Sequence, residues 1–346
     1  MKNRNFPIDV LKTIGLLCIM LAHVNPPDWI FQLRQFDVPL VVIVSWYLFS
    51  LSQNSQKETL REYFRKRCIR LVLPTWIFLA IFFWSFWMYS QVKNTVFPFT
   101  FHEIKSSIFL WKGIGYVWII RVYLMISIFW PLWLKLLQKT KLRYLIIVLL
   151  YILYELLLFY FLQKYGNWSG KKYVLWTFFY LYAYFFFFYF GSILPKIKKR
   201  YIWFLALVWG IITFFHANSV WWFFSPEFVL QSMKYPPHMY YNSYSITISS
   251  LLFLIMPFFK ILRFEPLKFT FSFISSSSLW IYLWHIFPVY ILSTYFPDMN
   301  FLYQFGLIIS FSLSVVILQK GLIIWILECC KVSPEKRKII IQILCS

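Results

Sequence analysis

Residues 8–24 read IDVLKTIGLLCIMLAHV, an apolar stretch that contains the ionisable side chains Asp9, Lys12 and His23. Each such group costs about 3 kcal/mol or more at membrane depth, so all three require partners or a function. Lys12 and His23 are eleven residues apart. A continuous helix would therefore place them on one face, about 16 Å apart. We predict that the first membrane-spanning helix has a polar face.

The composition favours an integral membrane protein. Of the 346 residues, 61% are hydrophobic, 24% are aromatic and only 13% are charged. A soluble protein of this length would be less apolar. The net charge of +22 does not indicate a nucleic-acid partner, because the basic residues fall in short clusters between apolar runs.

Hydropathy and charge together predict an all-α integral membrane fold, a bundle of about ten transmembrane helices with both termini cytoplasmic. With that orientation, 23 Lys and Arg residues lie in inner segments and 8 in outer segments, and Lys12, Arg121 and Lys320 lie within spans. Residues 1–346 are expected to form a single domain. The predicted spans are 8–26, 38–52, 71–90, 116–136, 144–163, 174–194, 202–217, 246–262, 271–294 and 304–328.

Two further features concern the ends and the cysteines of the chain. The first apolar run is interrupted by charges and no small-x-small cleavage site follows it, so we expect it to remain as a membrane anchor. The five cysteines have no metal-ligand spacing. We therefore expect neither a disulfide framework nor a metal site.

Arg67 and Arg70 form an Arg-x-x-Arg pair just before the third predicted span. Residues three apart are neighbours on a helix, so the two guanidinium groups can converge on one phosphate. One interpretation is a cytoplasmic binding site for a phosphate-bearing ligand. The other is that a basic run beside the membrane only sets topology and contacts lipid phosphate.

Three further charged residues fall inside predicted spans. Arg121 lies in the fourth span and Glu155 in the fifth, and an ion pair between them would offset the cost of both charges. If they are not paired, Arg121 is a candidate for contacting an acyl carbonyl or an acidic sugar. Lys320 is expected to extend towards the inner interface.

Three motifs occur in order along the chain: Ile8-Asp9-Val10-Leu11-Lys12 with His23, then Arg67-x-x-Arg70 ahead of Pro74, then Ser278-Leu279-Trp280-Ile281-Tyr282-Leu283-Trp284-His285. Together they resemble membrane-bound acyltransferase family 3. More narrowly, the chain resembles the bacterial branch that O-acylates cell-surface polysaccharides and includes fucose O-acetylase-like and intercellular-adhesin-modifying proteins. The chain departs from the family twice: Lys12 stands where the family usually has Arg, and Ser45-Trp46 stands where many members have Ser-Gly.

The resemblance implies transfer of an acyl group, with acetyl favoured, from cytoplasmic acyl-CoA to a hydroxyl of a polysaccharide or lipid-linked sugar near the outer face. Arg67 and Arg70 would bind the acyl-CoA. Tyr282 and His285 would support the reaction. No metal is expected. The protein would be a multi-pass component of the bacterial cytoplasmic (inner) membrane, in contact with membrane lipid and with polysaccharide synthesis or export machinery as a further partner.

His23 is the candidate general base, because a sugar hydroxyl needs a base and histidine titrates near neutrality. A less favoured role is transient acyl carrier. Lys12, held by Asp9 one helical turn away, would orient the donor arm or set the electrostatic field around it.

Two other functions remain open. A transporter or flippase of a lipid-linked glycan would also have many spans with polar groups at depth, but such proteins often have duplicated halves and Gly-broken or Pro-broken helices. The chain shows no duplication and contains only 9 Gly. A non-enzymatic partner subunit of a polysaccharide synthase is the third alternative.

Overall fold

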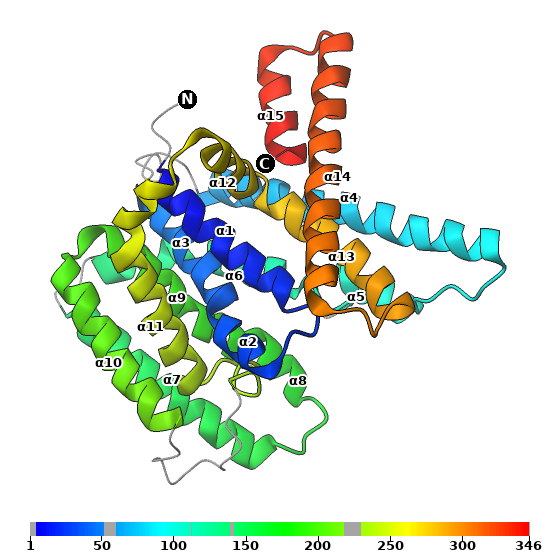
Figure 1. The fold of residues 1–346 in the computed structure, drawn as a ribbon. Coiled ribbons are helices and arrows are strands. Elements are labelled where there is room, and N and C mark those ends of the chain that lie inside the picture. The colour runs from blue at the N-terminus through cyan, green and yellow to red at the C-terminus, as the bar shows by residue number, and fades with distance from the viewer. Residues whose placement is uncertain (1–4, 52–59, 112, 139–141, 218–229, 346) are drawn as a thin grey trace. The chain divides into compact units, whose positions relative to one another are not determined.

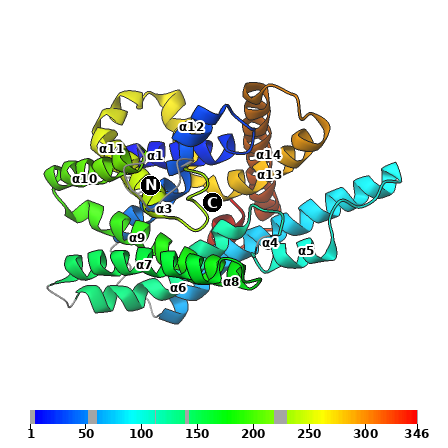
Figure 2. The ribbon, with the colours of Figure 1, turned by 90° about the horizontal axis from the view of Figure 1, so that it is seen from below.

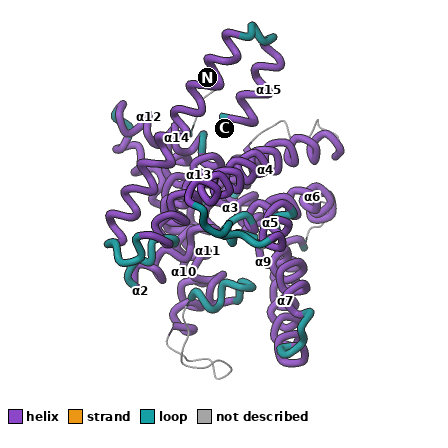
Figure 3. The backbone as a smooth tube through the Cα atoms, turned by 90° about the vertical axis from the view of Figure 1, so that its right-hand side faces the viewer, coloured by secondary structure: helices purple, strands orange, loops and turns teal. Residues whose placement is uncertain are grey.

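The computed structural model describes residues 5–51, 60–111, 113–138, 142–217 and 230–345, and this part of the chain is helical, with no β-strand (Figure 3). The chain divides into two compact units. The first comprises Met1–Ile19, Pro27–Glu58 and Ile128–Phe271. The second comprises Met20–Pro26, Thr59–Ser127 and Ser272–Ser346.

Six of the described helical segments are long and apolar enough to cross a membrane. They confirm that the chain is an all-helical protein with several candidate spans. A helix also occurs within each of the ten predicted ranges, but the number ten and the cytoplasmic placement of the termini stay predictions. The six segments are Phe64–Lys93, Tyr144–Tyr165, Lys171–Lys196, Lys199–Ala217, Met239–Leu262 and Phe301–Cys329.

The first unit is built around the contacts of two helix pairs (Figures 1 and 2): α3 (Asp37–Leu51) with α9 (Tyr180–Ile193), and α10 (Lys199–Ala217) with α11 (Met239–Ile255). It also contains most of α1 (Phe6–Leu21) and α12 (Glu265–Ser276) and the last part of α6 (Trp118–Gln138). Its other elements are α2 (Asp28–Leu33), η1 (Arg34–Phe36), α3 (Asp37–Leu51), α7 (Arg143–Tyr165), α8 (Lys171–Val174), η3 (Leu175–Phe179), α9 (Tyr180–Ile193), η4 (Leu194–Lys196), α10 (Lys199–Ala217), α11 (Met239–Ile255) and η5 (Met256–Leu262).

Helices α3 and α9 approach each other closely at Gly191. A Cβ atom built on Gly191 would lie 2.4 Å from the backbone oxygen of Ile43 and 3.0 Å from its Cα. Trp46 is buried one turn further along α3, with its ring 4.5 Å from that of Phe188 on α9. The two helices therefore pack closely although Trp46 stands where many family members have glycine, because the small residue at the contact is Gly191 on α9.

We expect Gly191→Ala to destabilise the first unit. The added methyl would meet backbone atoms, which cannot move aside as a flexible side chain can, and such overpacking costs about 1–3 kcal/mol. The measurement is the Tm of the purified protein in detergent. Gly306→Ala is the matched control, since a Cβ there has nothing within 4 Å, and its Tm should be unchanged or slightly higher.

The second unit contains α4 (Leu60–Lys93), α5 (Phe101–Ile108), the start of α6, α13 (Ser278–Tyr295), α14 (Phe301–Cys329) and α15 (Pro334–Leu344). The last carbonyl groups of α15 are bound by side chains of neighbouring helices. Trp280 Nε1 donates to Ile343 O at 3.1 Å, and Gln319 Nε2 donates to Leu344 O at 2.7 Å. These bonds satisfy carbonyls that a helix end leaves without partners.

Two predicted helix boundaries are wrong. The first helix ends at Leu21, not at residue 26, because Asn25 adopts a φ of 47° and is followed by Pro26 and Pro27, which have no N–H to continue a helix. The predicted span 271–294 is two helices with a break at Ser277. The Ser277 hydroxyl donates to Phe273 O, a side-chain bond to the backbone that competes with regular helix.

Lys320 contacts the junction of α12 and α13. Its ammonium group donates to Ser277 Oγ at 2.5 Å and lies 4.7 Å from the centre of the Phe273 ring. Its extension towards the inner interface stays a prediction.

Candidate functional site

Two of the predicted site residues, His23 and His285, lie together in the second unit. Their ring centroids are 5.3 Å apart, although 262 positions separate them in the chain. The ring of Tyr116 meets both, at 4.7 Å from His23 and 6.1 Å from His285. The three rings form a cluster that we call the histidine site.

Tyr282, another residue predicted to belong to the site, positions Tyr116 and His285 through hydrogen bonds. Its hydroxyl donates to Tyr116 O at 2.6 Å, and its own carbonyl oxygen is the hydrogen-bond partner of His285 Nδ1. Its ring lies 5.0 Å from that of His285. Tyr282 therefore orients two of the three rings.

The bond to the Tyr282 carbonyl determines the tautomer of His285. A carbonyl oxygen only accepts, so Nδ1 carries the proton, and in the neutral ring Nε2 is left with a lone pair. His285 is fully buried, and its Nε2 has no hydrogen-bond partner within the described part of the chain. A buried acceptor nitrogen thus lies beside the ring of His23.

His23 itself is half-buried. It lies in the turn after α1, where its N–H donates to Met20 O at 3.1 Å. The prediction that Lys12 and His23 share one continuous helix face is therefore wrong, because the helix ends two residues before His23. Part of the His23 side chain is exposed, whereas His285 beside it is fully buried.

Tyr116 reaches the site through a tight loop between α5 and α6. Gly113 and Gly115 have φ values of 45° and 88°, a region that favours glycine. The Ser107 hydroxyl accepts from Ile114 N at 3.0 Å and so ties this loop to the end of α5. The start of α5 is fixed by a capping box between Thr100 and Glu103.

Tyr116 and Ser107 are not among the residues predicted from the sequence. Tyr116 is one of 24 tyrosines and lies outside the three motifs. The only local signal is the pair of glycines that precedes it, which indicates a turn but not which side chain the turn presents.

The other predicted residues are distributed over both units. Arg67 and Arg70 lie on α4 in the second unit, where Arg67 is half-buried and Arg70 is exposed. The helix continues from Leu60 through both, so the assumption that they are neighbours on one helix is confirmed. Asp9, buried, and Lys12, half-buried, lie on α1 in the first unit.

The two charges predicted to pair inside spans have distinct surroundings. Arg121 is buried in the second unit, with its guanidinium carbon 4.3 Å from the centre of the Trp111 ring. Glu155 in the first unit accepts from the Tyr151 hydroxyl at 2.9 Å and from the backbone N–H of Met239. Glu155 therefore stabilises the start of α11, while its pairing with Arg121 stays a prediction.

Comparison with known proteins identifies the family. A model of the family described as "Acyltransferase domain" (acyltransferase family 3) matches residues 6–319, which include every predicted site residue. The comparisons with curated proteins and with solved structures each found no match. The family match supports an acyltransferase enzyme over a transporter or a non-enzymatic subunit. With a match over nearly its whole length, and with the two motif histidines side by side, the chain belongs to acyltransferase family 3.

Proposed function

We propose that the protein is an O-acyltransferase that moves an acyl group, with acetyl favoured, from cytoplasmic acyl-CoA to a hydroxyl of a cell-surface polysaccharide or lipid-linked sugar. In this proposal residues 1–346 act as one transmembrane domain of about ten spans with both termini cytoplasmic. It would lie in the bacterial inner membrane and belong to the branch that modifies surface polysaccharides.

The observation that supports this proposal best is the contact of His23 with His285. Nδ1 of His285 is bonded to the Tyr282 carbonyl, so its Nε2 can accept a hydrogen bond from His23. That bond would orient the His23 ring and leave its other ring nitrogen as an acceptor, which is the form that a general base requires.

The reaction then follows from general base catalysis. A nitrogen of His23 takes the proton of the sugar hydroxyl while the hydroxyl oxygen attacks the thioester carbonyl carbon. The carbon–oxygen bond forms, the carbon–sulfur bond breaks, and the proton passes from His23 to the departing thiolate. Atoms and charge balance without a metal or a redox cofactor. Attack of His23 itself on the thioester, with a transient acyl-imidazole, is the alternative route.

The donor would bind from the inner side. Arg67 and Arg70, one helical turn apart on α4, present two guanidinium groups suited to the phosphates of acyl-CoA. Arg121, at the start of α6, would face the acyl carbonyl or the acceptor, and Lys12 with Asp9 would orient the donor arm. The histidine site and Arg67 and Arg70 belong to the same compact unit, consistent with one binding path for the donor.

Labelled acetyl-CoA tests the proposal. The purified full-length chain, reconstituted in proteoliposomes with glycan from the source cell surface, should transfer label from acetyl-CoA to glycan. Mass spectrometry of the glycan, with and without the protein, should show the mass of one acyl group on a sugar. Glycan that crosses the membrane without gaining label would contradict the proposal and favour transport.

A further inference from the structure

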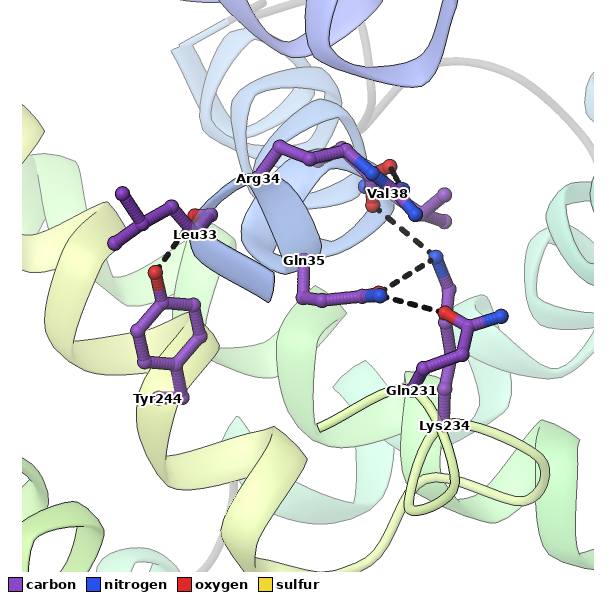
Figure 4. Close-up of polar contacts among 8 residues, drawn as sticks. Leu33, Arg34, Gln35, Val38, Gln231, Lys234 and Tyr244 are labelled. Carbon is purple, nitrogen blue, oxygen red and sulfur yellow. Dashed lines mark hydrogen bonds and ion pairs between the residues drawn. The ribbon is translucent and has the colours of Figure 1, made fainter. Parts of the chain in front are cut away.

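Two basic residues from segments predicted as outer loops are buried in the first unit. Arg34, in η1, is 4% exposed and Lys234, in the segment before α11, is 3% exposed, beside Asp37, which is 1% exposed. Arg34 Nη1 lies 2.6 Å from Asp37 Oδ2, and Lys234 Nζ lies 3.3 Å from Asp37 Oδ1 (Figure 4). Two cations therefore share one carboxylate.

Asp37 has little capacity left to balance a second positive charge. It accepts from both cations and also from the backbone N–H of Val38, at 2.6 Å. Among the described residues, Lys234 also donates to the neutral amide oxygen of Gln35 at 3.3 Å, and it lies over the rings of Tyr235 and Tyr241. The cluster of Arg34, Asp37 and Lys234, which we call the basic cluster, has a formal charge of +1.

Donor groups remain unused around this cluster. Arg34 Nε is buried and has no hydrogen-bond partner among the residues that the structure describes. The same holds for the hydroxyl of Tyr241, a fully buried residue whose ring centre lies 5.8 Å from Lys234 Nζ. Unpaired donors at a net positive charge favour an acceptor that is itself negatively charged.

Lys234 is held in place by its own segment. Gln35 Nε2 donates to Gln231 Oε1 at 2.6 Å (Figure 4). The backbone N–H of Lys234 donates to Gln231 O. The hydroxyl of Tyr154 donates to Pro237 O, and so does the side-chain amide of Asn242. The segment is therefore built into the first unit, with the carbonyl groups of Gln231 and Pro237 bound by protein donors.

A purely structural ion pair would not need the second cation. Arg34 and Asp37 alone form a neutral pair, and burying an additional unbalanced ammonium group costs several kcal/mol. We propose that the basic cluster binds an oxyanion, a carboxylate or a phosphate, carried by the acyl acceptor. This inference rests on the proposed function, and it assigns the acceptor to the acidic class: a uronic acid residue or the phosphate of a lipid-linked sugar.

Thermal unfolding of the full-length protein in detergent tests the binding without any acyl transfer. The probes are glucuronate for a carboxylate, glucose 1-phosphate for a phosphate, and glucose as the neutral reference, at constant ionic strength. One or both anionic sugars should raise the Tm by about 2–4 °C at saturation, and glucose should not. The anion that gives the shift identifies the source.

Lys234→Met is the decisive variant, because it leaves the neutral Arg34–Asp37 pair. Its Tm without probe should equal or exceed that of the wild type, and the shift with anionic sugar should disappear. Lys172→Met is the matched control, since Lys172 is an exposed lysine of the same unit, and it should keep the full shift. Tyr241→Phe retains both charges and should reduce the shift, which keeps the test valid if Lys234→Met fails to fold.

An equal shift in the wild type and in a folded Lys234→Met, or no shift with either anion in the wild type, would overturn the inference. In the transfer assay, Lys234→Met should raise KM for an acidic acceptor about tenfold and leave KM for acetyl-CoA unchanged. A chain that binds anionic sugar at Lys234 but transfers no label would contradict the proposed function and not the binding site.

Discussion

Replacement of His23 by alanine should abolish acyl transfer and leave the amount of protein in the membrane unchanged. In the proposed reaction His23 takes the proton of the acceptor hydroxyl, and general base catalysis contributes about 10²–10⁴-fold to such a step. The side chain is half-buried in a turn, so its removal leaves no large cavity. The measurement is label transferred from acetyl-CoA to glycan by reconstituted protein, at matched protein amounts.

His102→Ala is the control for this prediction. His102 is an exposed histidine of the same unit, on α5, and lies outside the histidine site. We expect it to transfer label at the wild-type rate. Unimpaired transfer by His23→Ala would remove His23 from the mechanism.

Replacement of His285 by phenylalanine should have the second largest effect. Phenylalanine keeps a ring of similar size in the buried position but removes both the donor to Tyr282 O and the acceptor beside His23. We expect kcat to fall by about 10–100-fold, in the range of losses caused by removing a supporting hydrogen bond. KM for acetyl-CoA should not change, because His285 acts through His23 and not on the donor. Steady-state kinetics with varied acetyl-CoA measure both constants.

The conservative variant His285→Gln separates positioning from packing. Glutamine can place an oxygen acceptor near the position of Nε2, so it should recover part of the lost kcat. If glutamine and phenylalanine give equal kcat, His285 contributes only packing.

The helical class and the main elements of the fold could be predicted from the sequence, because apolar runs of sufficient length carry that information locally. The two helix boundaries that were predicted wrongly depend on single residues, which a hydropathy average over many residues does not detect. Asn25 with its left-handed backbone ends the first helix early, and the hydroxyl of Ser277 divides the predicted ninth span. In both cases a few polar or proline residues within an apolar stretch ended the helix, although the mean hydropathy of the stretch favoured its continuation.

The candidate site was predictable where a motif carried it. His23, Tyr282 and His285 belong to motifs, and the structure brings them together. Tyr116 joins them only because Gly113 and Gly115 turn the chain towards the site, which no spacing in the sequence expresses.

The basic cluster was not predictable for a different reason. Arg34 and Lys234 fall between predicted spans, in outer segments where isolated basic residues are expected to face water. Their burial depends on contacts such as Gln35 with Gln231, which are 196 residues apart. A charge count along the chain treats such residues as exposed.

The buried segment that carries Lys234 affects how the orientation of this protein can be mapped in cells. Amine-reactive or thiol-reactive reagents that cannot cross a bilayer are commonly used to decide which loops face outward. Lys234, or a cysteine put in its place, would be shielded by tyrosine rings and by Asp37 whichever compartment it faces. Protection from such a reagent at this position would report enclosure by protein and would not show on which side of the membrane the segment lies.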